Sequence, residues 1–376
     1  MSAFNIETLL LLQQLERSTK SALAREAGVS SPKLSKILNR QQRAEDSIFE
    51  QIGIHLDYPI EFFNKNISLP PVYELTYRHT SRATQQELNA VAAEYALLSA
   101  TATQLANQVG IDSKTAWIDQ IAPRSEKITQ ADIEKIAENT RAHMRIEAHG
   151  TIKNVTRALE LVGIICAPLH SLTIQEQTTK LNSDGMTHPT GEQKLPVIGY
   201  KPNPAGDRER FTKAHELGHL ILHKYRRPEK YRDLEKEAHN FAGAFLMPQE
   251  DAHILMDENT MLSDIIQIKQ TWGISIAALI SRGYATKIFT KDRWRSLYMQ
   301  LSARRWRKNE PMPAGQEIPL LLNNMITKQY ADNNNQVDVF TLEHELGIPF
   351  RYLDTWANGL TEQGQNIGYI APRFNR

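Results

Sequence analysis

The residues best suited to chemistry lie in one short stretch, His215-Glu216-Leu217-Gly218-His219. Two histidines four positions apart lie on the same face of a helix, one turn apart, so both imidazoles can bind one metal ion. Glu216 projects about 100° around the helix from His215, which places it beside the ion. Zinc hydrolases use this arrangement of a metal-bound water and a neighbouring carboxylate. Because the motif is short, the alternative is an ordinary helix with two solvated histidines.

A catalytic zinc usually takes three protein ligands and a water, so a third ligand is needed. His223 follows on the same helix, but it lies about 12 Å along the axis from His215 and is too far to share the ion. The next helix offers Glu235 and Glu237. Glu237 falls within the apolar stripe of that helix, where a carboxylate is costly unless it is paired or bound to metal. We therefore predict Glu237 as the third ligand and keep Glu235, on the flank of the stripe, as the alternative.

The elements that must position these residues are predicted to be mostly helical, with a small sheet. Helices are expected from about residue 129 to 149 and over Ile152–Leu161. The apolar runs Val162–Ala167 and Leu195–Tyr200 are typical of buried strands. The helix with the two histidines follows, and another helix is expected over Glu235–Met247. The predicted fold class is therefore α+β, dominated by helices.

The N-terminal residues 5–63 are predicted to form a small all-helical bundle. Within it, residues 18–39 read as a helix, a turn at Gly28 and a second helix that Ser30 or Ser31 can cap. This pattern resembles the helix-turn-helix of the lambda-repressor-like (Xre-type) family. The resemblance implies that this part of the chain binds DNA.

The local charge agrees with a DNA-binding surface. The whole chain has a net charge of only +1, but seven basic residues and one acidic residue lie between Arg17 and Arg43. The predicted DNA contacts are side chains that could reach phosphates or base edges, namely Lys20, Ser31, Lys33, Lys36 and Arg40. The alternative is a helical bundle used for protein contacts or dimerisation.

A second resemblance is carried by two longer motifs in the right order. The stretch Arg210–His223, followed by Glu237-Ala238 and the run to Met247-Pro248, is similar to the ImmA/IrrE family of zinc peptidases. Pro196–Gly199 and Trp272–Arg282 also resemble that family, so the similarity covers residues from about 130 to 308.

This second resemblance implies a zincin-like peptidase domain that binds Zn²⁺. It implies His215, His219 and Glu237 as zinc ligands and Glu216 as the catalytic base. The family is associated with cleavage of Xre-type repressors or antitoxins, so a protein substrate of that kind is implied. Two alternatives stay open: the domain serves as a sensor or binding module without proteolysis, or the peptidase is latent until a signal or partner activates it.

The sequence suggests four units along the chain. Residues 1–68 form the DNA-binding unit, 69–127 a linker and connecting helix, 128–308 the peptidase unit, and 309–376 a helical C-terminal module of unknown role. The alanine-rich stretch 84–108 is expected to be a helix that connects the units or forms a homodimer.

Cysteine usage and hydropathy favour a cytoplasmic protein. Cys166 is the single cysteine, so no intramolecular disulfide can form, which suits a reducing compartment. No run approaches the ~18 apolar residues that a membrane span needs, so no membrane partner is expected.

The segment Lys287–Lys308 combines eight basic residues with Trp294, Tyr298 and Trp306. Basic and aromatic residues together can bind single-stranded nucleic acid. The same mixture also describes a helix with a packed aromatic face and a solvated basic face, which is the interpretation we favour.

Overall fold

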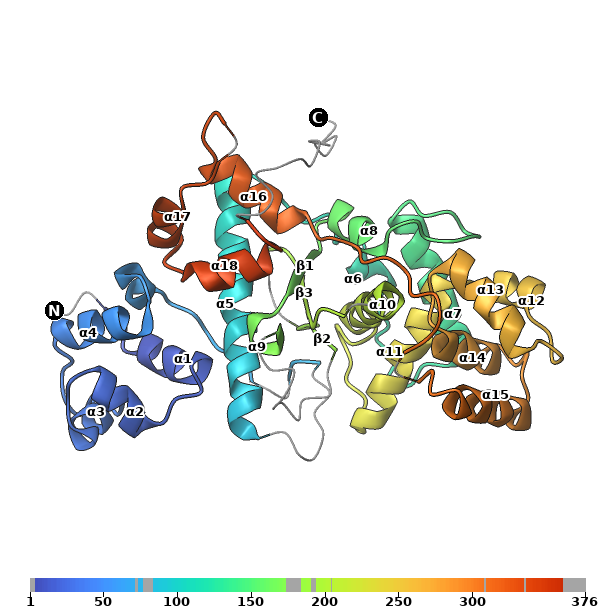
Figure 1. Cartoon of the computed structure of the whole chain (residues 1–376), viewed down its shortest axis with the longest axis horizontal. Helices are drawn as coiled ribbons and strands as arrows, with labels where there is room; N and C mark the ends of the chain where they lie inside the picture. The colour runs from blue at the N-terminus through green and yellow to red at the C-terminus, as the bar shows by residue number, and fades with distance from the viewer. Residues whose placement is uncertain are drawn as a thin grey trace.

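The computed structural model describes residues 4–71, 74–76, 84–173, 184–190, 194–203, 205–307, 309–334 and 336–360. Over these residues the chain is mostly helical and has a small three-stranded sheet, which confirms the α+β class (Figure 1). Within the same residues, no helix is long and apolar enough to cross a membrane.

The N-terminal bundle consists of α1 (Glu7–Leu15), α2 (Lys20–Glu26), α3 (Ser31–Leu38), α4 (Asp46–Leu56) and the 3-10 turn η1 (Ile60–Asn64). Thr19 and Ser30 cap α2 and α3, because each side chain accepts a hydrogen bond from a backbone N–H of the first turn. Gly28 lies between the two helices at φ +64°, a conformation that suits glycine. α1 packs on the rest of the molecule, whereas α2 and α3 lie on the outer side (Figure 1).

Helix α5 (Gln85–Val109) stands between this bundle and the sheet (Figure 1). Thr84 and Glu87 cap its start reciprocally, and Gly110 ends it in a left-handed conformation. Buried residues lie on several sides of α5, because α1 packs on one side of it and the C-terminal helix α16 on another. The Tyr95 hydroxyl donates to the carbonyl of Val197 at 2.9 Å, which fixes α5 to the sheet.

The sheet has the order β1-β3-β2. β1 (Ile165–Pro168) runs parallel to β3 (Val197–Tyr200), and β2 (Gly185–Met186) is antiparallel to β3. Side chains alternate between two cores: Ile165 and Val197 join the core around α5, whereas Cys166 and Ile198 join the core around α10. Because both faces are covered, both strands are apolar throughout.

The remaining helices on the far side of the sheet are α6 (Ile118–Ile121), α7 (Gln130–His143), α8 (Val155–Leu161), α10 (Gly206–Leu222), α11 (Tyr231–Leu246), α12 (Gln249–Leu255), α13 (Leu262–Trp272), α14 (Ile276–Ala285) and α15 (Lys291–Ala303). α10 lies against the sheet, and α11 lies between α10 and α7. On α15, Trp294 and Tyr298 pack toward α14, while Lys291 and Arg295 are exposed. This agrees with the packed aromatic face and solvated basic face expected there.

The C-terminal helices α16 (Leu321–Tyr330), α17 (Val339–Leu346) and α18 (Phe350–Trp356) pack back onto the first half of the chain. α16 contacts α5 and β1, α17 contacts η1, and α18 contacts β1 and the short helix α9 (His170–Thr173). One apolar core therefore includes the N-terminal bundle, α5, one face of the sheet and these helices. This core extends across the predicted unit boundaries near residues 68 and 308. Residues 361–376 of the predicted C-terminal module lie outside the described residues.

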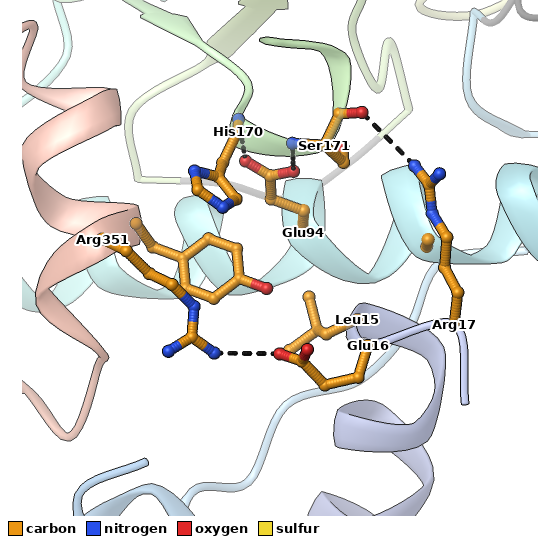
Figure 2. Close-up of a pocket in the computed structure, with 9 residues that line it drawn as sticks. Leu15, Glu16, Arg17, Glu94, His170, Ser171 and Arg351 are labelled. Atoms are coloured by element: carbon orange, nitrogen blue, oxygen red, sulfur yellow. Dashed lines mark hydrogen bonds and ion pairs between the residues drawn. The ribbon is translucent and has the colours of Figure 1, made fainter. Parts of the chain in front are cut away.

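A pocket of about 180 Å³ lies where the N-terminal bundle, α5, α9 and α18 meet (Figure 2). At its mouth, Arg351 of α18 donates to Glu16 at the end of α1 at 2.9 Å. At its base, the buried Glu94 of α5 accepts the backbone N–H groups of His170 at 2.5 Å and Ser171 at 2.7 Å. These contacts join the N-terminal bundle to α18, and α5 to α9.

Candidate metal centre

Close packing of α10 on α11 creates the site. Ala214, Leu217 and Ile221 are buried on α10 and hold it in the core. Gly218 lies at the crossing with α11, where a Cβ would be only 2.9 Å from the ring of Phe241. The absence of a side chain at this position lets the two helix backbones approach each other. The histidines of α10 therefore face the acidic first turns of α11.

Three donor atoms converge there from His215, His219 and Glu235. The Nε2 atoms of the two histidines are 3.0 Å apart. The two carboxylate oxygens of Glu235 each lie 3.5 Å from one of these nitrogens. The three ligand atoms all lie within 4.8 Å of one another. Two imidazole nitrogens and one carboxylate oxygen are the donor set of a catalytic zinc site with its fourth position open.

The protonation states of these groups suit a metal. Burial lowers the pKa of His219 to about 3, so its imidazole is neutral at neutral pH. Burial also acts to raise the pKa of Glu235, but hydrogen bonds and charge from His215 and His219 outweigh it and hold that pKa below its usual range. A neutral imidazole and an ionised carboxylate are the forms that bind metal, so the residues present fit Zn²⁺.

The predicted third ligand, Glu237, does not lie in this cluster, and the alternative, Glu235, takes its place. The carboxylate of Glu237 accepts two hydrogen bonds from the guanidinium of Arg226, at 2.6 and 3.1 Å. The side chains of Glu235 and Glu237 are 18% and 15% exposed, so burial does not distinguish them. A carboxylate in the apolar stripe of α11 was expected to need a partner, and in the structure the partner of Glu237 is Arg226, which precedes α11.

His223 links the metal cluster to this ion pair. Its Nδ1 lies 2.9 Å from Nδ1 of His219, and its Nε2 lies 3.1 Å from the carboxylate of Glu237. If His219 binds metal through Nε2, its Nδ1–H can donate to His223, whose Nε2–H then donates to Glu237. His223 is also the residue that caps the C-terminal end of α10. Its contact with His219 could have been predicted from the sequence, because His223 follows His219 by four residues on the same helix.

Glu216 lies under the edge of the sheet and is only 3% exposed. Its Oε2 accepts a hydrogen bond from the Thr76 hydroxyl at 2.8 Å. A Cβ at Gly185 of β2 would lie 2.8 Å from Glu216, so the strand backbone rests directly on this side chain. Burial raises the pKa of Glu216 well above its ordinary value, although the bond from Thr76 opposes the shift. A carboxylate with a raised pKa can both take up and release a proton near neutral pH. Nothing in the sequence pattern pointed to Thr76.

The predicted DNA contacts lie on α2, on α3 and just after α3, far from the metal cluster (Figure 1). Lys20, Lys36 and Arg40 are exposed, and Ser31 and Lys33 are half-buried. Two of the cations have acidic neighbours, since Lys33 lies 2.9 Å from Glu45 and Arg40 pairs with Glu7.

Comparison with known proteins bears on the metal cluster. Residues 171–282 match a peptidase family model described as the IrrE N-terminal-like domain. The matched stretch includes α10 and α11 with all three donors and Glu216. The match supports an ImmA/IrrE-like peptidase domain in this part of the chain. No curated protein matches the chain.

Proposed function

We propose that the chain is a cytoplasmic regulator that combines DNA binding with zinc-dependent endopeptidase activity. The substrate is a protein such as a repressor or antitoxin. The observation that carries the proposal is the convergence of His215, His219 and Glu235 on one point, with Glu216 next to them on the same helix. The family match over residues 171–282 supports the same activity.

In this mechanism His215, His219 and Glu235 hold the metal. When bound, zinc supplies a Lewis acid that polarises the peptide carbonyl and makes water a better nucleophile. Glu216 takes the proton from the attacking water and passes it to the leaving amine, a role that contributes about 10²–10⁴-fold in such reactions. His223 connects His219 to the ion pair of Glu237 and Arg226. This pair therefore keeps the imidazole of His219 in one tautomer and one orientation.

The substitution Glu216→Gln tests the peptidase activity. It should leave the zinc content at the wild-type level and lower the cleavage of purified Xre-type repressors by at least about 10²-fold. Zinc content is measured by atomic emission, and cleavage by gel electrophoresis and mass spectrometry. Cleavage that survives this substitution would contradict the role of Glu216.

A sensor or binding role without proteolysis is the second candidate. The observation that favours it is the near-complete burial of Glu216 beneath Thr76 and Gly185. The test uses zinc-loaded wild type and variants of Thr76, the residue that covers Glu216. If all of them bind the repressors offered but cleave none, this second function is the correct one.

DNA binding is proposed for the N-terminal bundle because α2 and α3 lie on the outer side of the molecule (Figure 1), and their residues Lys20 and Lys36 are exposed. The double substitution Lys33→Glu and Lys36→Glu should strongly weaken binding to operator DNA. Each phosphate contact adds about 0.9 to the steepness with which log K falls against log salt concentration. The binding that remains in the double variant should therefore show a slope that is smaller by about 2. The matched control is Lys291→Glu with Arg295→Glu on α15, which reverses two exposed charges elsewhere. Equal losses in both double variants would indicate a general charge effect and not a site.

A further inference from the structure

We propose that the chain blocks its own peptidase site with the segment Glu74–Thr76, which lies where an extended peptide must bind. This inference rests on the proposed function, because it concerns the regulation of the same site. In the structure, Thr76 contacts both the sheet edge and the catalytic glutamate.

Thr76 pairs with the edge of the sheet next to β2. β2 is an edge strand in the order β1-β3-β2, and Thr187 follows it directly. The backbone N–H of Thr76 donates to the carbonyl of Thr187 at 3.0 Å, and the N–H of Thr187 donates to the Thr76 hydroxyl at 2.9 Å. An extended peptide that adds to a sheet edge uses these same backbone groups. Thr76 therefore occupies the hydrogen-bonding positions that such a peptide needs.

Thr76 also contacts Glu216 directly. The Thr76 hydroxyl lies 2.8 Å from Glu216 Oε2 and 3.1 Å from the carbonyl of Thr187, and it has one proton to donate. Whether this proton goes to Glu216 or to the carbonyl of Thr187, the hydroxyl oxygen of Thr76 fills the space next to the Glu216 carboxylate. Glu216 is 3% exposed, and both Gly185 and Thr76 lie directly against it. A water or a peptide can approach this carboxylate only after Thr76 moves.

Within the part of the chain that the structure describes, few contacts hold the segment Glu74–Thr76. Leu75 is buried in the core around α5, and Glu74 lies 3.2 Å from the ring of His188. The Glu74–His188 pair is partly exposed, with Glu74 at 34%. Thr187 is fixed more firmly, because its hydroxyl donates to the carbonyl of Val197 in β3 at 2.8 Å. The sheet edge at Thr187 is therefore the fixed side of this contact, and Glu74–Thr76 is the side that another peptide can replace.

The experiment is competition by the segment itself, added as a separate molecule. The probe is a fluorescein-labelled synthetic peptide with the sequence of residues 70–80, and binding to the full-length chain is measured by fluorescence anisotropy, with and without zinc. Thr76→Pro removes both the N–H and the hydroxyl of the intramolecular segment. If the segment covers the site most of the time, this variant should bind the peptide at least about tenfold more tightly than the wild type.

Thr76→Val is the second variant, because it removes only the hydroxyl and keeps the backbone donor. It should bind the peptide more tightly than the wild type but less tightly than Thr76→Pro. The matched control is Thr140→Val on α7, which removes a buried hydroxyl bonded to the Ile136 carbonyl and far from the sheet edge, and it should bind like the wild type. Equal binding by the wild type and both Thr76 variants, with unchanged circular dichroism spectra, would overturn the proposal.

Cleavage of a purified Xre-type repressor by the same zinc-loaded variants separates this proposal from the proposed function. Faster cleavage by Thr76→Pro, abolished again by adding Glu216→Gln, supports both. Tighter peptide binding without cleavage by any variant means that the segment covers a binding site and that the peptidase assignment is wrong. Cleavage by the wild type that neither Thr76 variant accelerates means that the peptidase assignment is right and the self-blocking segment is not.

Discussion

The first half of α10, up to Lys213, and its second half, from Ala214, differ in the partners of their buried polar side chains. In the first half, each buried ion meets an ion of opposite sign: Asp207 lies 2.5 Å from Lys269, and Arg210 pairs with Glu317. In the second half, His215 and His219 meet the carboxylate of Glu235, with no lysine or arginine paired to it in the part of the chain that the structure describes. A carboxylate that already has a protein cation holds the fold together, whereas one that faces only imidazoles is available to a metal.

The same difference separates two residues of α11. Glu237 is bound by Arg226 in two hydrogen bonds, and Glu235 two positions earlier faces His215 and His219. The side chains have the same chemistry and similar exposure. Their partners alone distinguish them: Glu235 lies in the cluster with His215 and His219, and Glu237 lies behind His223.

The first half of α10 packs against a segment that lies about 100 residues further along the chain. Residues 309–320 cross the start of α10, where a Cβ at Gly206 would lie only 2.0 Å from the carbonyl oxygen of Gly315. Glu317 from this segment accepts the backbone N–H groups of Val155 at 3.0 Å and Thr156 at 2.7 Å, in addition to its bond from Arg210. This single carboxylate thus joins α8, α10 and the C-terminal part of the chain.

The largest effect that we predict is loss of this structural pair. Glu317→Ala leaves the Arg210 guanidinium buried without its counter-ion, and breaking a buried pair in this way costs about 3–5 kcal/mol. The free energy of unfolding, measured with urea, should fall by that amount. Glu138→Ala, which breaks an exposed pair with Lys135, is the control and should change little. Folded Glu317→Ala protein should still bind zinc, and a parallel loss of metal affinity would mean that the two halves of α10 are not independent.

The next effect is on metal affinity and distinguishes the two glutamates of α11. Glu235→Ala removes a ligand and should weaken zinc binding by more than the roughly 10–100-fold that the loss of a supporting residue causes. Glu237→Ala should fall within that range, because it removes only the acceptor behind His223. Zinc affinity is measured by competition with a chromogenic chelator. The reverse order would restore Glu237 as the third ligand.

The sequence was sufficient to predict what helix periodicity decides locally. His215 and His219 are four residues apart, so any α-helix brings them together, and Glu216 follows on the adjacent face. The apolar runs that became β1 and β3 and the capped start of α3 are equally local. Nonlocal partners could not be found in this way. Arg226 for Glu237 and Thr76 for Glu216 depend on how helices and loops dock, which periodicity does not encode.

The same limit applies to the organisation of the chain. The long helix at residues 84–108 was predicted from its composition, and α5 confirms it. Its neighbours were not predicted, because small residues such as Ala93 and Ala102 allow close packing on several sides without specifying the partner. The return of α16 and α18 to this helix follows from tertiary contacts between distant segments, such as Trp356 with Glu94 at 2.9 Å.

The smallest effect that we predict concerns a buried carboxylate with neither a cation nor a metal donor set. Glu160 is 5% exposed, and its Oε1 accepts the N–H groups of Leu320 and Leu321, both at 2.8 Å. Its Oε2 has no hydrogen-bond partner within the described residues. Burial raises the pKa of Glu160 from 4.5 to about 7, although the two backbone bonds and the charges of Arg157 and Lys213 oppose the shift.

The sign of the resulting pH dependence follows from proton binding. Between pH 4.5 and about 7 the folded state keeps the Glu160 proton that the unfolded state has released, so the free energy of unfolding falls as pH rises through this window. Glu160→Gln keeps the Oε1 acceptor and removes the titration. Relative to the wild type, the variant should therefore gain about 1–3 kcal/mol in unfolding free energy between pH 4.5 and pH 8, measured by urea denaturation. A difference that does not change with pH would mean that Glu160 stays ionised in the fold, and that a buried carboxylate here needs no cation.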